Sequence, residues 1–236
     1  AIEYRIRDLE GAEDVGFANA VVSDFYSGTL TGTPDPDYIE GTAGADIVRG
    51  LNRADWIVTL DGNDTIEAAL GDDLIDAGAG DDTISGGDGA DRIDGGAGFD
   101  TVTFLDSDIG VRADLETRLG QGGFAQGDVY IGIEALVGSA FNDQLGGDGT
   151  DNLLDGGAGR DILEGRGGAD ALIGGIGDDT LSGGTGADTL DGGDGSDTAV
   201  YEFSDVGVSI SLAAGTASGG EADGDTVRSV ENIIGR

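Results

Sequence analysis

The sequence contains no cysteine, histidine, lysine or methionine, and only two of its 236 residues are proline. Without cysteine and histidine the chain has no disulfide framework, no zinc or haem ligands, no cysteine nucleophile and no histidine base. Basic residues are also scarce, because 11 arginines face 48 acidic residues and leave a net charge of −37. A chain of this charge is not expected to bind nucleic acids or anionic lipids, since both are themselves negative.

Long hydrophobic runs are missing as well. No apolar run approaches the roughly 20 residues that span a bilayer, and no secretory signal peptide is visible. We therefore expect no transmembrane span. The chain begins with Ala1 and ends at Arg236 without an evident terminator, so we treat it as a candidate piece of a longer protein.

Glycine and acidic residues are abundant instead. The 48 glycines do not recur with the period of three that collagen needs. A glycine-rich chain of such high net charge is typical of disorder when composition alone is considered. The order of the residues therefore decides whether the acids are scattered or placed.

The acids follow a nine-residue repeat. From Gly32 the chain divides into eight nonapeptides over 32–103 and seven more over 138–200, such as GGDGADRID and GGTGADTLD. The eighth place is always aliphatic, and the sixth place is Asp in fourteen repeats and Asn in one. The sixth-place residues are Asp37, Asp46, Asp55, Asp64, Asp73, Asp82, Asp91, Asp100, Asp143, Asn152, Asp161, Asp170, Asp179, Asp188 and Asp197.

A longer repeat contains the short one. A shift of 97 residues places Asp100 on Asp197 and aligns GGFAQGDVYIGIEALVG with GGEADGDTVRSVENIIG. This predicts two tandem blocks, 32–103 and 138–200, followed by the β-rich connectors 104–137 and 201–236, which we expect to cap the open ends of the arrays. In 1–31, Ile2, Tyr4 and Ile6 alternate with charged residues, which predicts a strand-rich cap or the tail of an upstream segment.

The nonapeptide specifies a turn followed by a short strand. Glycines at places 1, 2 and 4 permit positive φ and bring successive carbonyl groups close together. The next three residues favour β structure, with one inward side chain at place 8. Two turns and two strands form an 18-residue coil, and stacked coils form two parallel sheets over a thin aliphatic core. The fold class is therefore all-β, a solenoid.

In such a stack each sixth-place Asp lies directly below the Asp 18 residues later. Stacked carboxylates repel one another unless a cation lies between them. Carboxylates together with turn carbonyls form an all-oxygen donor set of flexible geometry, which favours Ca²⁺ over transition metals and Mg²⁺. The turn glycines that we expect to contribute are Gly78, Gly80, Gly87, Gly89, Gly96, Gly98, Gly157, Gly159, Gly168, Gly175, Gly177, Gly184, Gly186, Gly193 and Gly195.

The G-G-x-G-x-D-x-U-x pattern over 32–103 and 138–200 resembles the RTX, or haemolysin-type calcium-binding, family. The resemblance implies a right-handed parallel β-roll in two tandem blocks of the kind found in large secreted RTX proteins. It also implies export by a type I secretion machinery, an extracellular or cell-surface location, and folding outside the cell on binding calcium.

The resemblance further implies calcium between turns two repeats apart. This gives two columns of sixth-place residues in each block and about 11 interior sites. These ions would offset about 22 of the negative charges. We expect the best-ordered ions over 78–100 and 156–197, and a weaker site at Asn152. Leu51 and Arg53 replace glycines, so we expect that turn to lack the glycine geometry and the ions near Asp55 and Asp73 to be the least certain.

Three functional classes stay open. The first is a calcium-binding structural or export module without catalysis, and this is our prediction. The second is a self-associating surface-layer or adhesive component. The third is the non-catalytic part of an RTX enzyme, such as a protease or an alginate epimerase, whose catalytic domain lies outside this chain. The outward aromatic residues Tyr38 and Trp56 fit either packing at place 7 or a carbohydrate-binding patch, and we favour packing.

Overall fold

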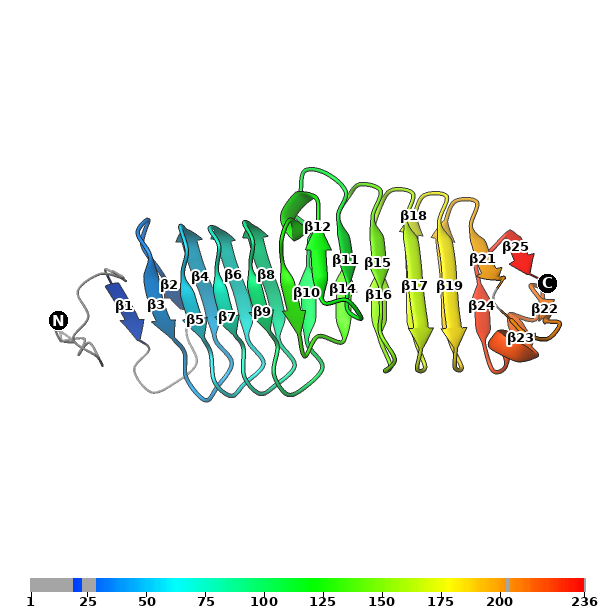
Figure 1. The fold of residues 1–236 in the computed structure, drawn as a ribbon, viewed down its shortest axis with the longest axis horizontal. Helices are drawn as coiled ribbons and strands as arrows, with labels where there is room; N and C mark the ends of the chain where they lie inside the picture. The colour runs from blue at the N-terminus through cyan, green and yellow to red at the C-terminus, as the bar shows by residue number, and fades with distance from the viewer. Residues whose placement is uncertain (1–18, 23–28, 203, 236) are drawn as a thin grey trace.

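The computed structural model describes residues 19–22, 29–202 and 204–235. The predicted strand at Ile2, Tyr4 and Ile6 lies outside the described residues. Within them the chain forms an elongated solenoid of two facing sheets, with strands stacked one coil after another along its length (Figure 1). Two short 3-10 helices, η1 (Gly123–Ala125) and η2 (Gly220–Ala222), interrupt the strands. No helix of the described part of the chain is long and apolar enough to cross a membrane.

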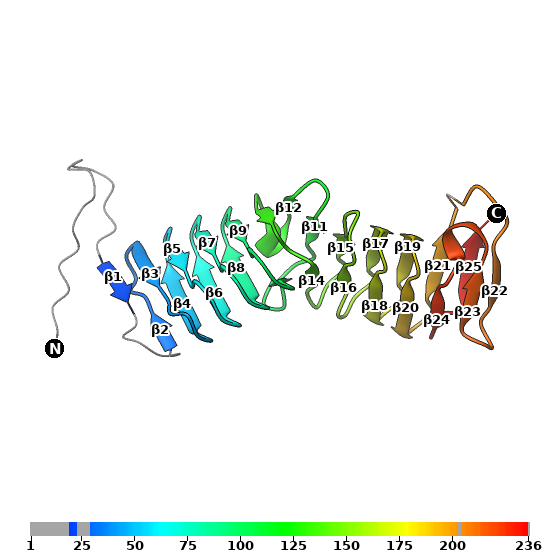
Figure 2. The same ribbon diagram turned by 90° about the horizontal axis from the view of Figure 1, so that it is seen from below.

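The two sheets run along opposite sides of the solenoid (Figure 2). The 13-stranded sheet has the order β1 (Asn19–Val22), β3 (Asp37–Glu40), β5 (Trp56–Val58), β7 (Leu74–Asp76), β9 (Arg92–Asp94), β13 (Val129–Ile131), β12 (Leu119–Gln121), β11 (Arg112–Asp114), β15 (Gln144–Gly146), β17 (Ile162–Gly167), β19 (Thr180–Thr185), β21 (Thr198–Tyr201) and β25 (Asn232–Gly235). The 12-stranded sheet has the order β2 (Thr29–Thr31), β4 (Ile47–Asn52), β6 (Thr65–Leu70), β8 (Thr83–Asp88), β10 (Thr101–Thr103), β14 (Ala135–Val137), β16 (Leu153–Asp155), β18 (Ala171–Ile176), β20 (Thr189–Asp194), β24 (Thr226–Arg228), β23 (Thr216–Ser218) and β22 (Ser209–Ser211).

The register between coils is 18 residues, as the nonapeptide predicts. Ile57 lies beside Ile39 and Ile75 in the 13-stranded sheet, and the pairing is parallel. Every eighth-place side chain from both arrays is at most 1% exposed and contributes to one continuous hydrophobic core. The prediction of an all-β parallel solenoid with a thin aliphatic core is confirmed, and its cause is the single inward residue of each short strand.

The first connector does not end the roll. Strand β13 pairs in parallel with β9, and β14 lies between β10 and β16, so both sheets continue through residues 104–137. The antiparallel hairpin β11–β12 lies inside the 13-stranded sheet and passes the pairing on to β15. We expected a cap here. The connector instead keeps its backbone donors paired on both sides, which continues the stack and leaves no exposed edge to cap.

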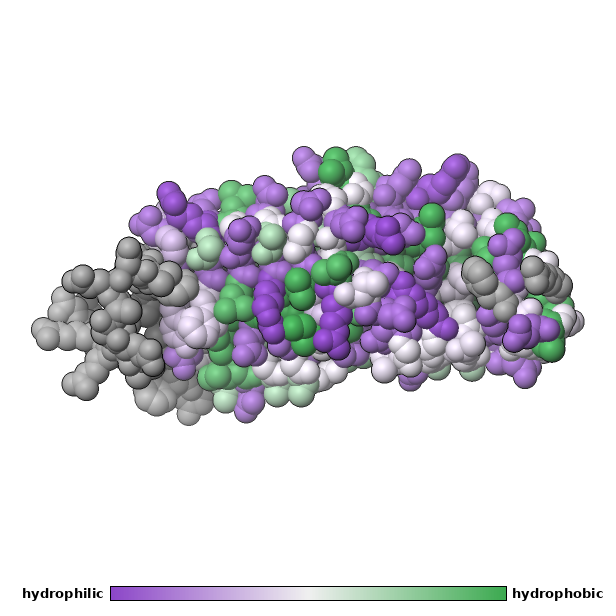
Figure 3. All heavy atoms as spheres, in the orientation of Figure 1, coloured by the Kyte–Doolittle hydropathy of each residue, from purple (hydrophilic) through white to green (hydrophobic). Residues whose placement is uncertain are grey.

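Side chains at place 7 face outward, as the strand alternation predicts. Trp56 is 40% exposed and packs edge-on against Tyr38, with ring centroids 5.1 Å apart. Figure 3 shows that hydrophobic residues on the visible face are scattered among hydrophilic ones. The aromatic pair is therefore a packing contact between neighbouring coils.

Candidate calcium sites

The fifteen sixth-place residues all lie in the turns along the two edges of the roll. Each of them is buried, with at most 3% of its surface exposed. Burial of so many carboxylates is costly unless every oxygen has a partner. The partners of the two carboxylate oxygens therefore decide what the turns can bind.

In eleven of the sixth-place residues, one carboxylate oxygen accepts a hydrogen bond within the stack. The backbone N–H of Asp64 donates to Oδ1 of Asp82 at 2.7 Å, and the N–H of Asp82 donates to Oδ1 of Asp100 at 2.9 Å. The same bond joins residues 18 apart eleven times, with distances of 2.7–2.9 Å. The stacked carboxylates thus hold the coils in register.

The other oxygen has no partner in eleven of these residues. Each of these Oδ2 atoms is buried and accepts no hydrogen bond from the described residues. They belong to Asp55, Asp64, Asp73, Asp82, Asp91, Asp100, Asp161, Asp170, Asp179, Asp188 and Asp197. A buried carboxylate oxygen without a protein partner, in so regular a series, is the arrangement expected of a cation ligand.

The turn glycines lie close against carbonyl groups of the preceding coil. A Cβ added at Gly78 or Gly80 would collide with the carbonyl oxygen of the residue 18 positions earlier, which is Leu60 or Gly62. The same collision with the preceding coil occurs at the other predicted glycines, and all of them except Gly89 have positive φ. Glycine therefore favours the close approach of one turn to the next, because it has no Cβ.

Our expectation for the turn at Leu51 and Arg53 is wrong for the backbone of Leu51, and the uncertain occupancy near Asp55 and Asp73 stays a prediction. Arg53, with a φ of 67°, differs from the glycines at place 4, such as Gly80 with a φ of 141°. Leu51, with a φ of 89°, adopts the conformation of the glycines at place 2, such as Gly87 with a φ of 96°. The strand ladder imposes it, because Leu51 pairs with Ala69, which has a φ of 82°, and Ala69 pairs with Gly87. A left-handed conformation costs a residue with a Cβ about 1–2 kcal/mol. The backbone of this turn therefore matches that of its neighbours at place 2 and differs from it at place 4.

The donor set fits calcium. Carboxylate and carbonyl oxygens line the turns, and Ca²⁺ takes six to eight oxygen ligands in flexible geometry. No group of three or more acidic side chains in the described ranges is arranged to hold a metal ion by itself. An ion between the coils would therefore depend on backbone carbonyls for much of its coordination. The residues that would hold it are the sixth-place carboxylates and the turn glycines.

Four carboxylates of the connectors were missed by the sequence analysis. The N–H of Asp91 donates to Oδ1 of Asp128 at 2.9 Å, and the N–H of Asp100 donates to Oε2 of Glu134 at 2.9 Å. In the second copy, the N–H of Asp188 donates to Asp225 and the N–H of Asp197 donates to Glu231 in the same way. The 97-residue repeat contained the signal, because it aligns Asp128 with Asp225 and Glu134 with Glu231. The columns of stacked acids therefore continue beyond the nonapeptides.

Tyrosine hydroxyls occupy the second oxygen of two of these acids. The hydroxyl of Tyr130 donates to Oδ2 of Asp128 at 3.2 Å, and that of Tyr201 donates to Oδ2 of Asp225 at 3.0 Å. The two tyrosines are not equivalent in the 97-residue repeat, since Tyr130 aligns with a valine and Tyr201 with a phenylalanine. Both copies therefore contain the same tyrosine–aspartate hydrogen bond, with the tyrosine on β13 in the first copy and on β21 in the second.

Burial raises the pKa of most sixth-place carboxyls. The pKa rises to about 7 at Asp73 and at Asp161, because of desolvation first and neighbouring aspartates second, against the lowering effect of a backbone hydrogen bond. The folded, calcium-free chain thus holds protons that the unfolded chain releases near its ordinary pKa of about 3.9. A raised folded pKa means that stability is lost as pH rises from about 4 through about 7.

Two opposite pH effects are therefore expected. In calcium-free buffer, lowering the pH from 8 to 5 should increase β structure, whereas in limiting calcium the same change should weaken calcium binding, because protons compete for the ligands. Circular dichroism over this pH range measures the first effect and a calcium electrode the second. A calcium-free spectrum that does not change with pH would contradict the assigned pKa directions.

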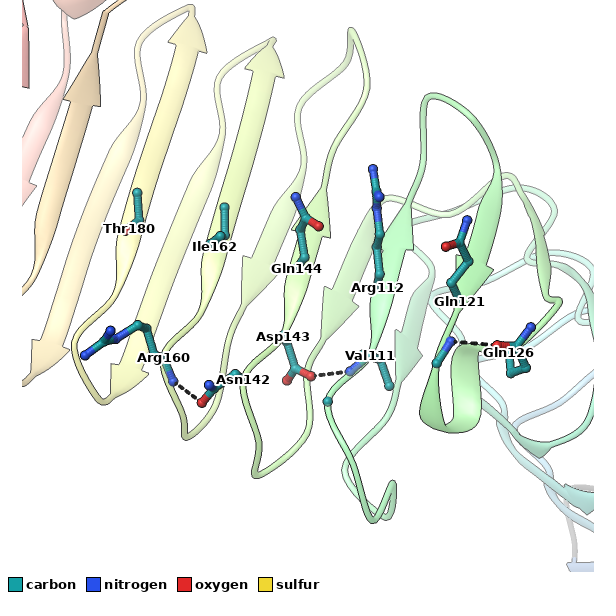
Figure 4. Close-up of a pocket in the computed structure, with 12 residues that line it drawn as sticks. Val111, Arg112, Gln121, Gln126, Asn142, Asp143, Gln144, Arg160, Ile162 and Thr180 are labelled. Carbon is teal, nitrogen blue, oxygen red and sulfur yellow. Dashed lines mark hydrogen bonds between the residues drawn. The ribbon is translucent and has the colours of Figure 1, made fainter.

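An open hollow lies elsewhere, on the outer face of the 13-stranded sheet beside the first connector (Figure 4). Gln121, Arg112 and Gln144 lie in register on β12, β11 and β15, and Ile162 continues the row. In this region the N–H of Val111 donates to Oδ1 of Asp143, which starts the acidic column of the second array. The hollow therefore lies across the junction of connector and array and does not include an unpartnered carboxylate oxygen.

Comparisons with known proteins agree with this geometry. The family model of the RTX calcium-binding nonapeptide repeat matches residues 25–52, 49–84, 69–102, 130–163 and 164–199, which together exceed half of the chain. A comparison with curated proteins gives no match. The family model covers both arrays and the end of the first connector, where the stacked carboxylates lie. The chain therefore belongs to the RTX calcium-binding nonapeptide repeat family.

Proposed function

We propose that the chain is a structural calcium-binding module, in which Ca²⁺ ions lie between successive coils along both edges of the roll. The observation that supports this most directly is the series of eleven buried Oδ2 atoms without a partner. Each belongs to a residue whose Oδ1 atom already accepts the N–H of the coil before it. One oxygen therefore fixes the register and the other is free for an ion.

The proposed role includes folding on calcium binding, without catalysis by this chain. The carboxylates that would hold the ions belong to different coils and come together only when the coils stack. The site therefore does not exist in the unfolded chain. The periodic acids are accounted for by the two edges of the roll and need no catalytic role. The proposal includes export by a type I machinery and folding outside the cell, which the family resemblance supports.

Calorimetric titration of the calcium-depleted chain tests the proposal. We expect about eleven bound Ca²⁺ ions at saturation, with Mg²⁺ binding far more weakly, because Mg²⁺ requires octahedral geometry and gives up water reluctantly. Native mass spectrometry supplies an independent count of the ions. A chain that binds no calcium at millimolar concentration, or that binds Mg²⁺ equally well, would contradict the proposal.

A further inference from the structure

The fifteen turns that end in a sixth-place residue are of two kinds. In eleven of them the residue at place 2 has positive φ, and these are the turns whose sixth-place Oδ2 atom lacks a partner. In the other four the residue at place 2 does not have positive φ. We name the first kind open turns and the second kind closed turns. The closed turns have Thr33, Thr42, Ser139 and Asp148 at place 2.

A closed turn satisfies its own sixth-place side chain. In the turn at Asp46, the N–H of Thr42 donates to Oδ2 at 2.6 Å and the Thr42 hydroxyl donates to the same oxygen at 2.9 Å. In the turn at Asp143, the N–H of Ser139 donates to Oδ2 at 2.6 Å, and its hydroxyl lies 2.9–3.0 Å from the two carboxylate oxygens. The donors of place 2 thus occupy the oxygen that an open turn leaves free.

The remaining two closed turns repeat this pattern. The N–H of Thr33 donates to Oδ2 of Asp37 at 2.5 Å, with the hydroxyl at 3.1 Å. The N–H of Asp148 donates to Oδ1 of Asn152 at 2.7 Å. Asn152 is the only sixth-place residue that is not a carboxylate. Its turn therefore needs neither a hydroxyl nor a cation to be satisfied.

Closed turns occur only where each array begins. They are the first two turns of the first array and the first two turns of the second. In the second array, the coil before them is the connector, since Asp143 accepts the N–H of Val111 and the side chain of Asn152 donates to the carbonyl of Glu134. A closed turn therefore lies where the preceding coil is not a nonapeptide turn that could share an ion with it.

We propose that the residue at place 2 decides whether a turn takes calcium, and that Thr33, Thr42, Ser139 and Asp148 terminate the calcium-binding series by replacing the ion with hydrogen bonds. This inference rests on the proposed calcium function. A threonine or serine at place 2 closes the turn by offering a hydroxyl beside its own N–H. An Ala, Leu, Arg or Gly at place 2 offers no such group, and the turn stays open with positive φ.

The tyrosine hydroxyls on Asp128 and Asp225 perform the same task after the arrays. Each follows an open turn and satisfies the Oδ2 atom of the next acid in the column. In the column from Asp37 to Asp128, hydroxyl groups of Thr33 and Tyr130 thus stand on both sides of the open turns. The proposal assigns the ions to the open turns only, so that calcium binding ends where the repeats end.

Ala69 provides the test, because it already has a Cβ at place 2 of an open turn, with a φ of 82°, and leads to Asp73. The matched variants are Ala69→Thr and Ala69→Val, which are both β-branched and differ only in the hydroxyl. At saturating calcium, native mass spectrometry should find one ion fewer in Ala69→Thr than in the wild type. Ala69→Val should keep the wild-type number. Equal ion numbers in the two variants would overturn the proposal.

A second position guards against a variant that fails to fold. Arg166 has a φ of 76° at place 2 of the open turn that ends at Asp170. Arg166→Thr and Arg166→Val both lose the ion pair with Asp114, so their difference again reports the hydroxyl alone. One ion fewer in the threonine variant supports the proposal, and equal numbers overturn it. A wild-type chain that binds no calcium would instead overturn the proposed function, and the inference with it.

Discussion

In calcium-free buffer at neutral pH the chain is expected to lose most of its β structure, and millimolar Ca²⁺ is expected to restore it. The stack buries eleven carboxylates with an oxygen that has no partner, and burying an unpaired charge costs several kcal/mol. A folded domain has a net stability of only about 5–15 kcal/mol. The calcium-free roll therefore cannot carry these carboxylates in their charged form.

Far-UV circular dichroism during a calcium titration measures this effect. Binding at about 100 times the dissociation constant contributes about 2.7 kcal/mol for each ion, so a few ions account for the whole stability of a typical domain. A titration with NaCl at equal ionic strength is the control, because simple screening acts on exposed charges and much less on buried ones. A spectrum that is β-rich without calcium and does not change when calcium is added would contradict the prediction.

Replacing Asp82 by asparagine is expected to remove at least one bound ion and to raise the calcium concentration at the folding midpoint about tenfold, which corresponds to about 1.4 kcal/mol. Asn keeps an oxygen for the N–H of Asp64 and so preserves the register bond. It removes the charge of the Oδ2 atom that has no partner. The same result is expected for Asp179→Asn in the second array, where Asp179 accepts the N–H of Asp161.

Asp76→Asn is the matched control. Asp76 is exposed at the end of β7 and makes no side-chain hydrogen bond or ion pair with the described residues, so the variant removes the same charge outside the turns. Its midpoint and its ion count should equal those of the wild type. Calorimetry and circular dichroism on Asp82→Asn, Asp179→Asn and Asp76→Asn distinguish the loss of a turn carboxylate from the loss of a carboxylate outside the turns. If Asp76→Asn shifts the midpoint as much as Asp82→Asn, net charge and not the stacked carboxylates controls binding.

Much of the fold follows from the nonapeptide alone. Its period places one aliphatic residue inward on each short strand, as at Ile57 and Leu163, and it places the sixth residue at the same edge in every second repeat. Both results need only the alternation of a strand and the length of a coil. For the same reason the exposure of Trp56 at place 7 could be predicted from the sequence.

The conformation of the irregular turns could not be predicted in this way. Local preference argues against positive φ at Leu51, Arg53 and Leu60, yet all three adopt it. At Leu51 the pairing with Ala69 of the next coil, which itself pairs with Gly87, fixes the backbone. A residue paired with a coil of positive φ has to follow it, because otherwise the ladder hydrogen bonds to that coil are lost.

The sequence by itself determined that this protein is a parallel β solenoid with aligned carboxylates, because a nine-residue period fixes which side chains point inward and which meet at the edges. Only the tertiary structure decided which of these carboxylates keep a free oxygen and how the two arrays join. Glu134 links Asp100 to Asn152 across the connector. Ser139 satisfies Asp143, which the repeat alone would assign to calcium, and Tyr130 satisfies Asp128 of the connector. The physical reason is that the partner of each carboxylate oxygen comes from a neighbouring coil, a neighbouring strand or the second place of its own turn. The identity of the sixth residue does not reveal which of these supplies the partner.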